Sequence, residues 1–168
     1  INRDIKFYKE HNINGVIEDG SQRCFFPNGL SFYVYAQTLF DESLTLESII
    51  EDYMSHAYGE ATPAVMEFFK TIDELMPQSY LEMRHSGLCS VKKYDDPSME
   101  EKFHAVAPVC QQLKETLTPY RNMPYRAQTV AVRLMCDYAD YCEGVAKILA
   151  LRCVGKNAEA MEAYEGFR

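Results

Sequence analysis

The chain has 168 residues, 47% of them hydrophobic and 25% charged, a balance typical of a folded globular protein. Its net charge is −8 and its longest run of basic residues is Lys92-Lys93, so nucleic acid and anionic lipid are disfavoured as partners, because both need a basic face. No stretch of about 18 apolar residues is present, so we expect no membrane span.

The cysteines do not form a recognisable metal or redox motif. None stands in a Cys-x-x-Cys pair, and four fall in segments that we expect to be helical, where cysteine behaves as a small hydrophobic residue. We therefore expect reduced and mostly buried thiols, with disulfides as the alternative, and we predict neither a metal site nor a cofactor. The six residues are Cys24, Cys89, Cys110, Cys136, Cys142 and Cys153.

The chain begins with what we interpret as a helix followed by a strand. Residues 2–11 have the pattern of a short helix, and the turn-forming residues 12–15 follow it. Residues 16–18 then indicate a short strand, the only convincing one in the sequence. Because a single strand cannot form a sheet, we expect its partners in preceding sequence that belongs to a longer parent protein. The absence of an initiator Met agrees with this expectation, and the sequence predicts no cellular location.

The next segments predict helices with recognisable ends. A helix is expected over residues 29–40, and a second is expected between Thr45, a good N-cap, and Gly59. A third should extend from Thr62 to the residue before Pro77.

Residues 78–96 predict a long loop with one helical turn at most, and residues 97–117 predict a further helix. Pro108 lies within this last helix, and its ring clashes with the carbonyl of His104. We therefore expect a kink or a break near these residues.

The longest helix is expected from Pro124 to Val154, capped by Asn122 at its start and ended by Gly155 in the left-handed conformation. A last helix should begin at Asn157. The fold class that follows is mainly α: a bundle of about five to six helices built on one long central helix, with a short N-terminal helix–strand remnant of a (β/α)8 barrel. The apolar stripe of the central helix that we expect to face the core is Ala127, Ala131, Leu134, Tyr138, Tyr141, Val145 and Ile148.

Two sets of polar residues are candidates for function. His56 has Asp52 four residues before it and Glu60 four after it, a spacing that can hold a metal ion or an acid–base pair. The alternative is a solvated charged face, and Gly59 would end the helix before Glu60. The residues Glu18, Asp19, Gln22 and Arg23 form the second set.

This second set lies at and just after the C-terminal end of the predicted strand, where α/β folds assemble their binding sites. Carboxylate, amide and guanidinium groups close to two phenylalanines suit a sugar better than a metal ion or a phosphate, because they offer hydrogen bonds in both directions and a stacking face. The alternative is that Glu18 and Asp19 only form the turn that ends the strand.

A family resemblance covers about the first half of the chain. The segment from Leu30 to Met76 resembles the region after the barrel in bacterial glycoside-hydrolase-like proteins related to α-glucuronidases and β-hexosaminidases. Phe40 stands where Trp is usual in those proteins, and the Pro that follows is missing. Residues 5–17 resemble the last helix–strand step of their barrel. The matching motifs are Leu39-Phe40-Asp41, Ala57-Tyr58-Gly59-Glu60 and Pro63-Ala64-Val65-Met66 with Phe68-Phe69.

The resemblance implies two regions: residues 1–28 as the last unit of a truncated barrel, and residues 29–168 as a C-terminal helical domain that braces the barrel. A saccharide would then bind through the parent protein's barrel. The family's catalytic carboxylates would lie on earlier strands, so no catalytic residue is carried over, and whether the parent is an active enzyme stays open. The alternative is a non-catalytic helical module that binds a protein partner through an exposed apolar stripe. The oligomeric state is not predicted.

Overall fold

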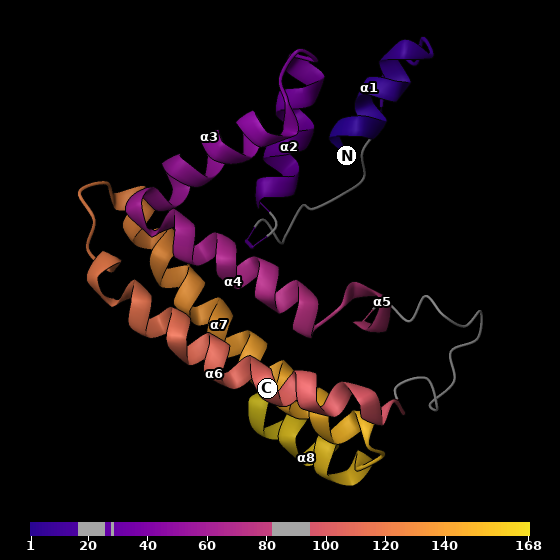
Figure 1. Cartoon of the computed structure of the whole chain (residues 1–168), viewed down its shortest axis with the longest axis vertical. Helices are drawn as coiled ribbons and strands as arrows, with labels where there is room; N and C mark the ends of the chain where they lie inside the picture. Colours follow the sequence, from indigo (N-terminus) through magenta and orange to yellow (C-terminus); the bar gives the residue numbers. More distant parts are fainter. Residues whose placement is uncertain (17–25, 28, 82–94) are drawn as a thin grey trace. The chain divides into compact units, whose positions relative to one another are not determined.

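The computed structural model describes residues 1–16, 26–27, 29–81 and 95–168. In these ranges the chain is helical and contains no strand, which confirms the prediction of a mainly α helical fold (Figure 1). Val16 is in neither helix nor strand, and the other two residues of the expected strand lie outside the described residues. The predicted boundary between residues 28 and 29 stays a prediction. As expected, no helix in the described part of the chain is long and apolar enough to cross a membrane.

The chain divides into two compact units, Ile1–Thr62 and Pro63–Arg168. In the first unit, α2 packs against both α1 and α3. The cap prediction for α3 is confirmed, because the backbone N–H of Ser48 donates to Thr45 Oγ1 at 3.1 Å and the helix ends at Gly59, whose φ is 53°. The elements of this unit are α1 (Asn2–Glu10), α2 (Gly29–Phe40), α3 (Leu46–Tyr58) and the 3-10 turn η1 (Gly59–Ala61).

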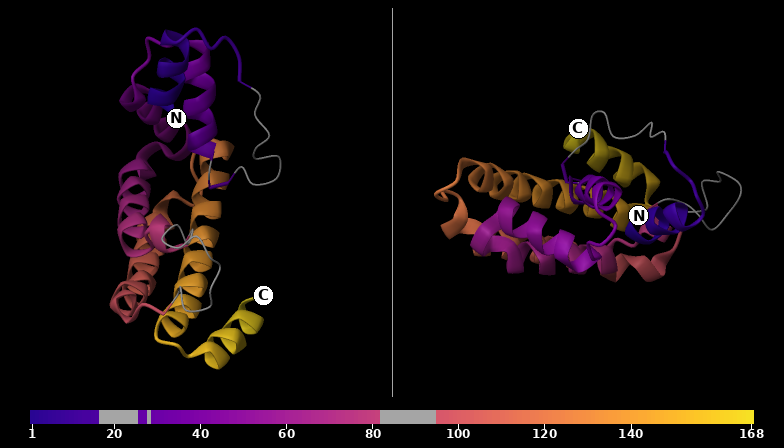
Figure 2. Two further views of the ribbon diagram at one scale, coloured as in Figure 1. Left: turned by 90° about the vertical axis from the view of Figure 1, so that its right-hand side faces the viewer. Right: turned by 90° about the horizontal axis from the view of Figure 1, so that it is seen from above.

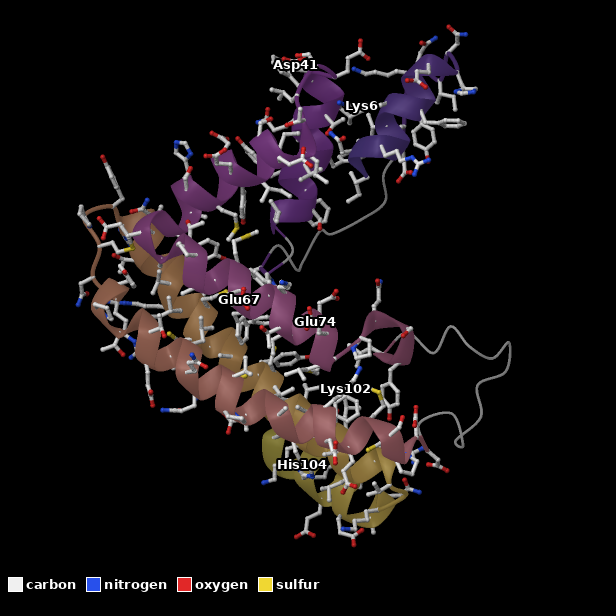
Figure 3. The ribbon with its side chains drawn as sticks, viewed as in Figure 1. Lys6, Asp41, Glu67, Glu74, Lys102 and His104 are labelled. Carbon is white, nitrogen blue, oxygen red and sulfur yellow. The ribbon has the colours of Figure 1, made fainter. Side chains whose placement is uncertain are left out.

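Polar contacts hold α1 on the pair formed by α2 and α3. Asn2 Nδ2 donates to Thr38 Oγ1 at 3.0 Å, and Thr38 is fully buried in α2. Lys6 Nζ donates to the carbonyl of Leu44 at 2.9 Å (Figure 3 shows Lys6 beside the turn that carries Asp41). The Thr38 hydroxyl also donates to the carbonyl of Val34 within α2 at 2.7 Å, so Asn2 uses its remaining acceptor capacity and joins α1 to α2 at a buried position.

The second unit is built on two long neighbouring helices, α6 and α7, and α8 packs against α7 (Figures 1 and 2). Lys114 Nζ of α6 lies 2.7 Å from Asp140 Oδ1 of α7. The elements are α4 (Thr62–Leu75), α5 (Gln78–Leu81), the 3-10 turn η3 (Pro97–Met99), α6 (Glu100–Leu117), the 3-10 turn η4 (Thr118–Tyr120), α7 (Arg126–Cys153) and α8 (Asn157–Phe167).

Side chains also join α4 to this pair of helices. The rings of Phe68 and Phe69 have their centroids 6.4 Å and 6.3 Å from that of Tyr138 in α7. Lys102 Nζ of α6 donates to the backbone carbonyl of Glu74, and Figure 3 shows both residues where the two helices lie side by side. The core of this unit is therefore formed by α4, α6 and α7 together.

Of the kink or break expected near Pro108, the break does not occur, and the kink stays a prediction. α6 is continuous from Glu100 to Leu117 with Pro108 inside it. Both Pro108 and His104 are exposed, so water can satisfy the His104 carbonyl that lacks a helical partner. The buried residues before and after the proline, Val106 and Cys110, remain on one face and hold the helix in place.

The predicted core face of α7 is wrong by about one residue, which corresponds to a rotation of roughly 100°. Leu134 and Tyr141, expected in the core, are 39% and 56% exposed, and Tyr138, Val145 and Ile148 are only half-buried. The buried face contains many Ala and Cys residues, whose small side chains allow neighbouring helices to approach closely. Its members are Val132, Met135, Cys136, Ala139, Cys142, Ala146, Ala150 and Cys153.

The sequence predicts the C-terminal end of α7 correctly but not the cap at its N-terminal end. The residue before its first turn is Tyr125, and no side chain caps it. Asn122, expected as the cap, instead accepts a hydrogen bond from Arg133 Nη2 at 2.7 Å. The C-terminal prediction is confirmed, because Gly155 has a φ of 78° and its N–H donates to the carbonyl of Arg152.

Gly144 provides the space in which α8 ends against α7. A Cβ atom at this position would lie 2.2 Å from the ring of Phe167, which also contacts the ring of Tyr141 with centroids 5.8 Å apart. A glycine inside a helix costs about 1 kcal/mol relative to alanine. The contact with Phe167 gives the physical reason for a glycine here.

The rotation of α7 predicts a contrast between neighbouring residues. Met135→Ala should lower the free energy of unfolding by about 2–5 kcal/mol, because Met135 is fully buried. Leu134→Ala should lower it by less than about 1 kcal/mol, because this side chain is exposed. Urea denaturation of both variants measures the difference. Equal losses of stability would show that the buried face is misidentified.

The contact between Gly144 and Phe167 predicts coupling between the two positions. In the Phe167→Ala background, Gly144→Ala should stabilise the chain by about 0.5–1 kcal/mol, because alanine favours the helix and the ring is absent. With Phe167 present, the same substitution should give a smaller gain or a loss. A double-mutant cycle by urea denaturation measures this coupling, and an equal gain in both backgrounds would contradict it.

Candidate functional site

The candidate saccharide-binding residues Glu18, Asp19, Gln22 and Arg23 all lie outside the described residues. Their expected contact with a sugar therefore stays a prediction. The described part of the chain contains a different group of polar and aromatic side chains, at the other set of residues that the sequence singled out.

This group forms an open groove of about 510 Å³ between α2 and α3, which we call the α2–α3 groove. One of its residues, Tyr33, comes from α2, and the others come from adjacent turns of α3. Positions four apart in a helix lie on the same face, so α3 presents Asp52 and His56 together. The groove is lined by Tyr33, Asp52, Tyr53, His56 and Ala57.

Hydrogen bonds and ring contacts fix the geometry of the groove. The hydroxyl of Tyr33 donates to Oδ2 of Asp52. The ring of Tyr33 is tilted by 48° against that of Tyr53, with the centroids 5.4 Å apart. His56 Nδ1 lies 2.8 Å from the backbone carbonyl oxygen of Asp52 and 3.4 Å from its Oδ1. The Asp52 carboxylate is therefore the common partner of a phenol and an imidazole.

The two phenols of the groove are held in the neutral form. The hydrogen bond to Asp52 raises the pKa of Tyr33, and burial and the negative charge of Asp52 act in the same direction. Burial raises the pKa of Tyr53. Because both phenols stay protonated around neutral pH, the groove presents neutral ring faces beside a single carboxylate.

Of the three residues Asp52, His56 and Glu60 that the sequence pattern combined, the structure brings together only Asp52 and His56. α3 ends at Tyr58, and Glu60 lies in the following turn η1 and does not line the groove. Tyr33 takes the third place, and sequence spacing could not reveal this because Tyr33 belongs to another helix. No group of three possible metal ligands is found in the part of the chain that the structure describes.

The arrangement is better suited to binding than to acid–base catalysis. The side chains of His56 and Asp52 are 80% and 50% exposed, so water surrounds both. Catalytic acids and bases are usually desolvated by the pocket that holds them. Ring faces and a carboxylate at the floor of an open groove can still bind a ligand by stacking and by a charge-assisted hydrogen bond.

The described cysteines are free and buried, as predicted for Cys110, Cys136, Cys142 and Cys153. Cys24 and Cys89 lie outside the described residues. Burial raises the pKa of Cys110 to about 12, and burial also raises the pKa values of Cys142 and Cys153. Since the thiolate is the nucleophile, these three thiols act as core residues and not as reactive groups.

The buried thiols should resist alkylation in the folded chain. At pH 8, iodoacetamide should modify Cys110, Cys142 and Cys153 at less than about one hundredth of their rate in denaturant, because burial suppresses the thiolate and blocks access. Peptide mapping by mass spectrometry measures each site, with glutathione in the same reaction as an exposed reference thiol. Rapid labelling of Cys110 in the folded chain would contradict its burial.

Comparison with known proteins gives one match. A family model described as a domain of unknown function (DUF4838) matches residues 1–70. No curated protein and no solved structure matches the chain. The matched stretch includes every residue of the α2–α3 groove. The family description names no activity, so the resemblance to glycoside-hydrolase-like proteins remains a hypothesis, and the similarity established for this chain is to DUF4838 over its first 70 residues.

Proposed function

We propose that the chain is the C-terminal helical part of a carbohydrate-active, glycoside-hydrolase-like protein. In this proposal it braces a preceding (β/α)8 barrel and does not itself catalyse a reaction. The saccharide binds in the parent protein's barrel, where Glu18, Asp19, Gln22 and Arg23 are the groups of this chain that would contact it. The motifs from Leu30 to Met76 and residues 5–17 carry the resemblance on which the proposal depends.

The observation that supports a preceding barrel is an apolar surface on α1 and the segment after it, which the proposal assigns to the barrel's last unit. We call it the α1 apolar surface, formed by Phe7, Tyr8, Ile13 and Val16, all exposed. Ile5 is the one residue of α1 that is buried in the described part of the chain. Single exposed apolar residues are common, but four on one short helix and its continuation favour a surface that another domain covers. In the proposal, α1 and this segment belong to the barrel's last helix–strand step, and the rest of the barrel would cover these side chains.

The composition of the α2–α3 groove supports a non-catalytic role. Glycoside hydrolysis uses a pair of carboxylates on either side of the scissile bond. The groove is lined by one carboxylate, Asp52, together with an imidazole and two phenols. The hydrolytic groups of the parent protein would therefore come from its barrel.

The second candidate is a helical module that binds a protein partner. It is favoured by the outer face of α7, where Val130, Leu134 and Tyr141 are exposed. The coding sequence upstream of Ile1 separates the two candidates. Alternating strand and helix segments there would agree with a barrel, and their absence would leave the interaction module as the better explanation.

Hydrogen exchange tests whether α1 belongs to a barrel. In the parent protein, amides of α1 should exchange at least about tenfold more slowly than in the 168-residue chain alone, because the rest of the barrel covers the α1 apolar surface. Amides of α8 serve as the internal control and should exchange equally in both proteins. Equal exchange of α1 in both would overturn the proposal.

A matched pair of variants sharpens this test. In the parent protein, Phe7→Ser should cost more than about 1 kcal/mol of stability, because Phe7 would be buried against the barrel. Tyr164→Ser on α8 removes another exposed aromatic side chain and should cost less. In the isolated chain the two substitutions should have similarly small effects, and a large cost of Phe7→Ser there would assign Phe7 to the local core instead.

A further inference from the structure

The Asp52 carboxylate in the α2–α3 groove is not neutralised by a basic side chain. Its partners are the hydroxyl of Tyr33 and the imidazole of His56, and no Lys or Arg in the described residues pairs with it. The imidazole is charged only when it is protonated, and it is 80% exposed. The carboxylate therefore lies beside two tyrosine rings, half-exposed, and no basic side chain in the described part of the chain neutralises it.

The residues around the groove strengthen this negative charge. Between Gly29 and Thr62 the sequence contains no Lys or Arg, while Glu51, adjacent to Asp52 in sequence, and Glu47 are exposed on the same helix α3. The nearest lysines in sequence before this stretch are on α1 and are used elsewhere: Lys6 donates to the carbonyl of Leu44, and Lys9 lies 3.6 Å from Glu42. Such a surface repels anions and attracts cations.

The tyrosine rings and the carboxylate of the groove favour a cationic ligand over a neutral one. The face of a tyrosine ring attracts a cation, and a carboxylate forms charge-assisted hydrogen bonds with one. A planar guanidinium group can do both, because it stacks on an aromatic ring and presents several N–H donors to a carboxylate. One carboxylate oxygen of Asp52, Oδ2, already accepts a hydrogen bond from the hydroxyl of Tyr33. This hydrogen bond holds the carboxylate beside the tyrosine rings. A neutral sugar would use the rings but not the charge.

We propose that the α2–α3 groove binds the guanidinium group of an arginine side chain carried by a partner protein. The guanidinium stacks against Tyr33 and Tyr53 and pairs with Asp52. This site is independent of the barrel and of its saccharide, so it adds a protein-binding function to the helical region.

The test uses two probes of nearly the same shape. N-acetyl-arginine amide carries the charge, and N-acetyl-citrulline amide replaces the guanidinium by a neutral urea group. Titrating each into the 15N-labelled 168-residue chain should shift amide signals of α2 and α3 near the groove. We expect the arginine probe to bind at least about fivefold more tightly than the citrulline probe, and the difference to shrink as salt is raised.

Variants identify the groups responsible. Asp52→Asn keeps an oxygen that can accept the Tyr33 hydroxyl, so it should fold normally yet lose at least about fivefold in affinity for the arginine probe. Tyr53→Leu should weaken binding and Tyr53→Phe should preserve it, because the ring face is what matters. Glu159→Gln on α8 removes an exposed carboxylate outside the groove and should leave the affinity unchanged.

Three results would overturn the proposal. The first is equal binding of the arginine and citrulline probes, and the second is unchanged arginine binding by a correctly folded Asp52→Asn variant. The third is a stronger response of the same amides to methyl β-glucoside than to the arginine probe, which would make the groove a site for neutral saccharides.

Discussion

The rotation of α7 about its own axis is the constraint on which the second unit depends. α7 packs against both α6 and α8, and its Tyr138 ring contacts the two phenylalanines of α4. Its buried residues include small ones such as Ala139 and Ala146, and the buried residues of α6 include large ones such as Phe103 and Leu117. Large side chains packed beside small ones give close contact without voids, which is the condition for a well-ordered core. A different rotation of α7 would move every one of these contacts.

The parts of the fold that could be predicted from sequence are those decided by local chemistry. Thr45 begins a helix because its hydroxyl can accept a nearby N–H, and Gly59 and Gly155 end helices because a positive φ is inexpensive for glycine. These events need no information about neighbouring helices. The extents of α2 and α3 were accordingly predicted closely.

The parts that were predicted wrongly depend on neighbours or on solvent. The predicted stripe of α7 follows apolar residues at steps of three and four, and this pattern includes Leu134 and Tyr141, which lie outside the core. The helices that pack closely on α7 instead cover its alanines and cysteines. The break expected as one outcome at Pro108 does not occur, because Pro108 lies on the exposed side of α6, where water can replace the lost hydrogen bond.

The candidate site shows the same division. The pairing of His56 with Asp52 was visible in the sequence, because residues four apart share a helix face. The sequence does not predict the contact of Tyr33 with Asp52, because the two residues belong to different helices. How α2 and α3 lie against each other depends on the turn between them, and the spacing of residues along one helix carries no information about that turn. Glu60 was separated from the pair by the turn at Gly59, an outcome that the glycine itself indicated.

The contact between Gly144 and Phe167 has a practical consequence for protein engineering. α8 folds back along α7, so the last residue, Arg168, lies beside the C-terminal half of that helix and not beyond the end of the helix pair. An affinity tag or a fluorescent reporter fused there would emerge from the flank of α7, next to Tyr141. A short rigid linker would press the fusion partner against this flank, whereas a flexible glycine- and serine-rich linker would let it move clear.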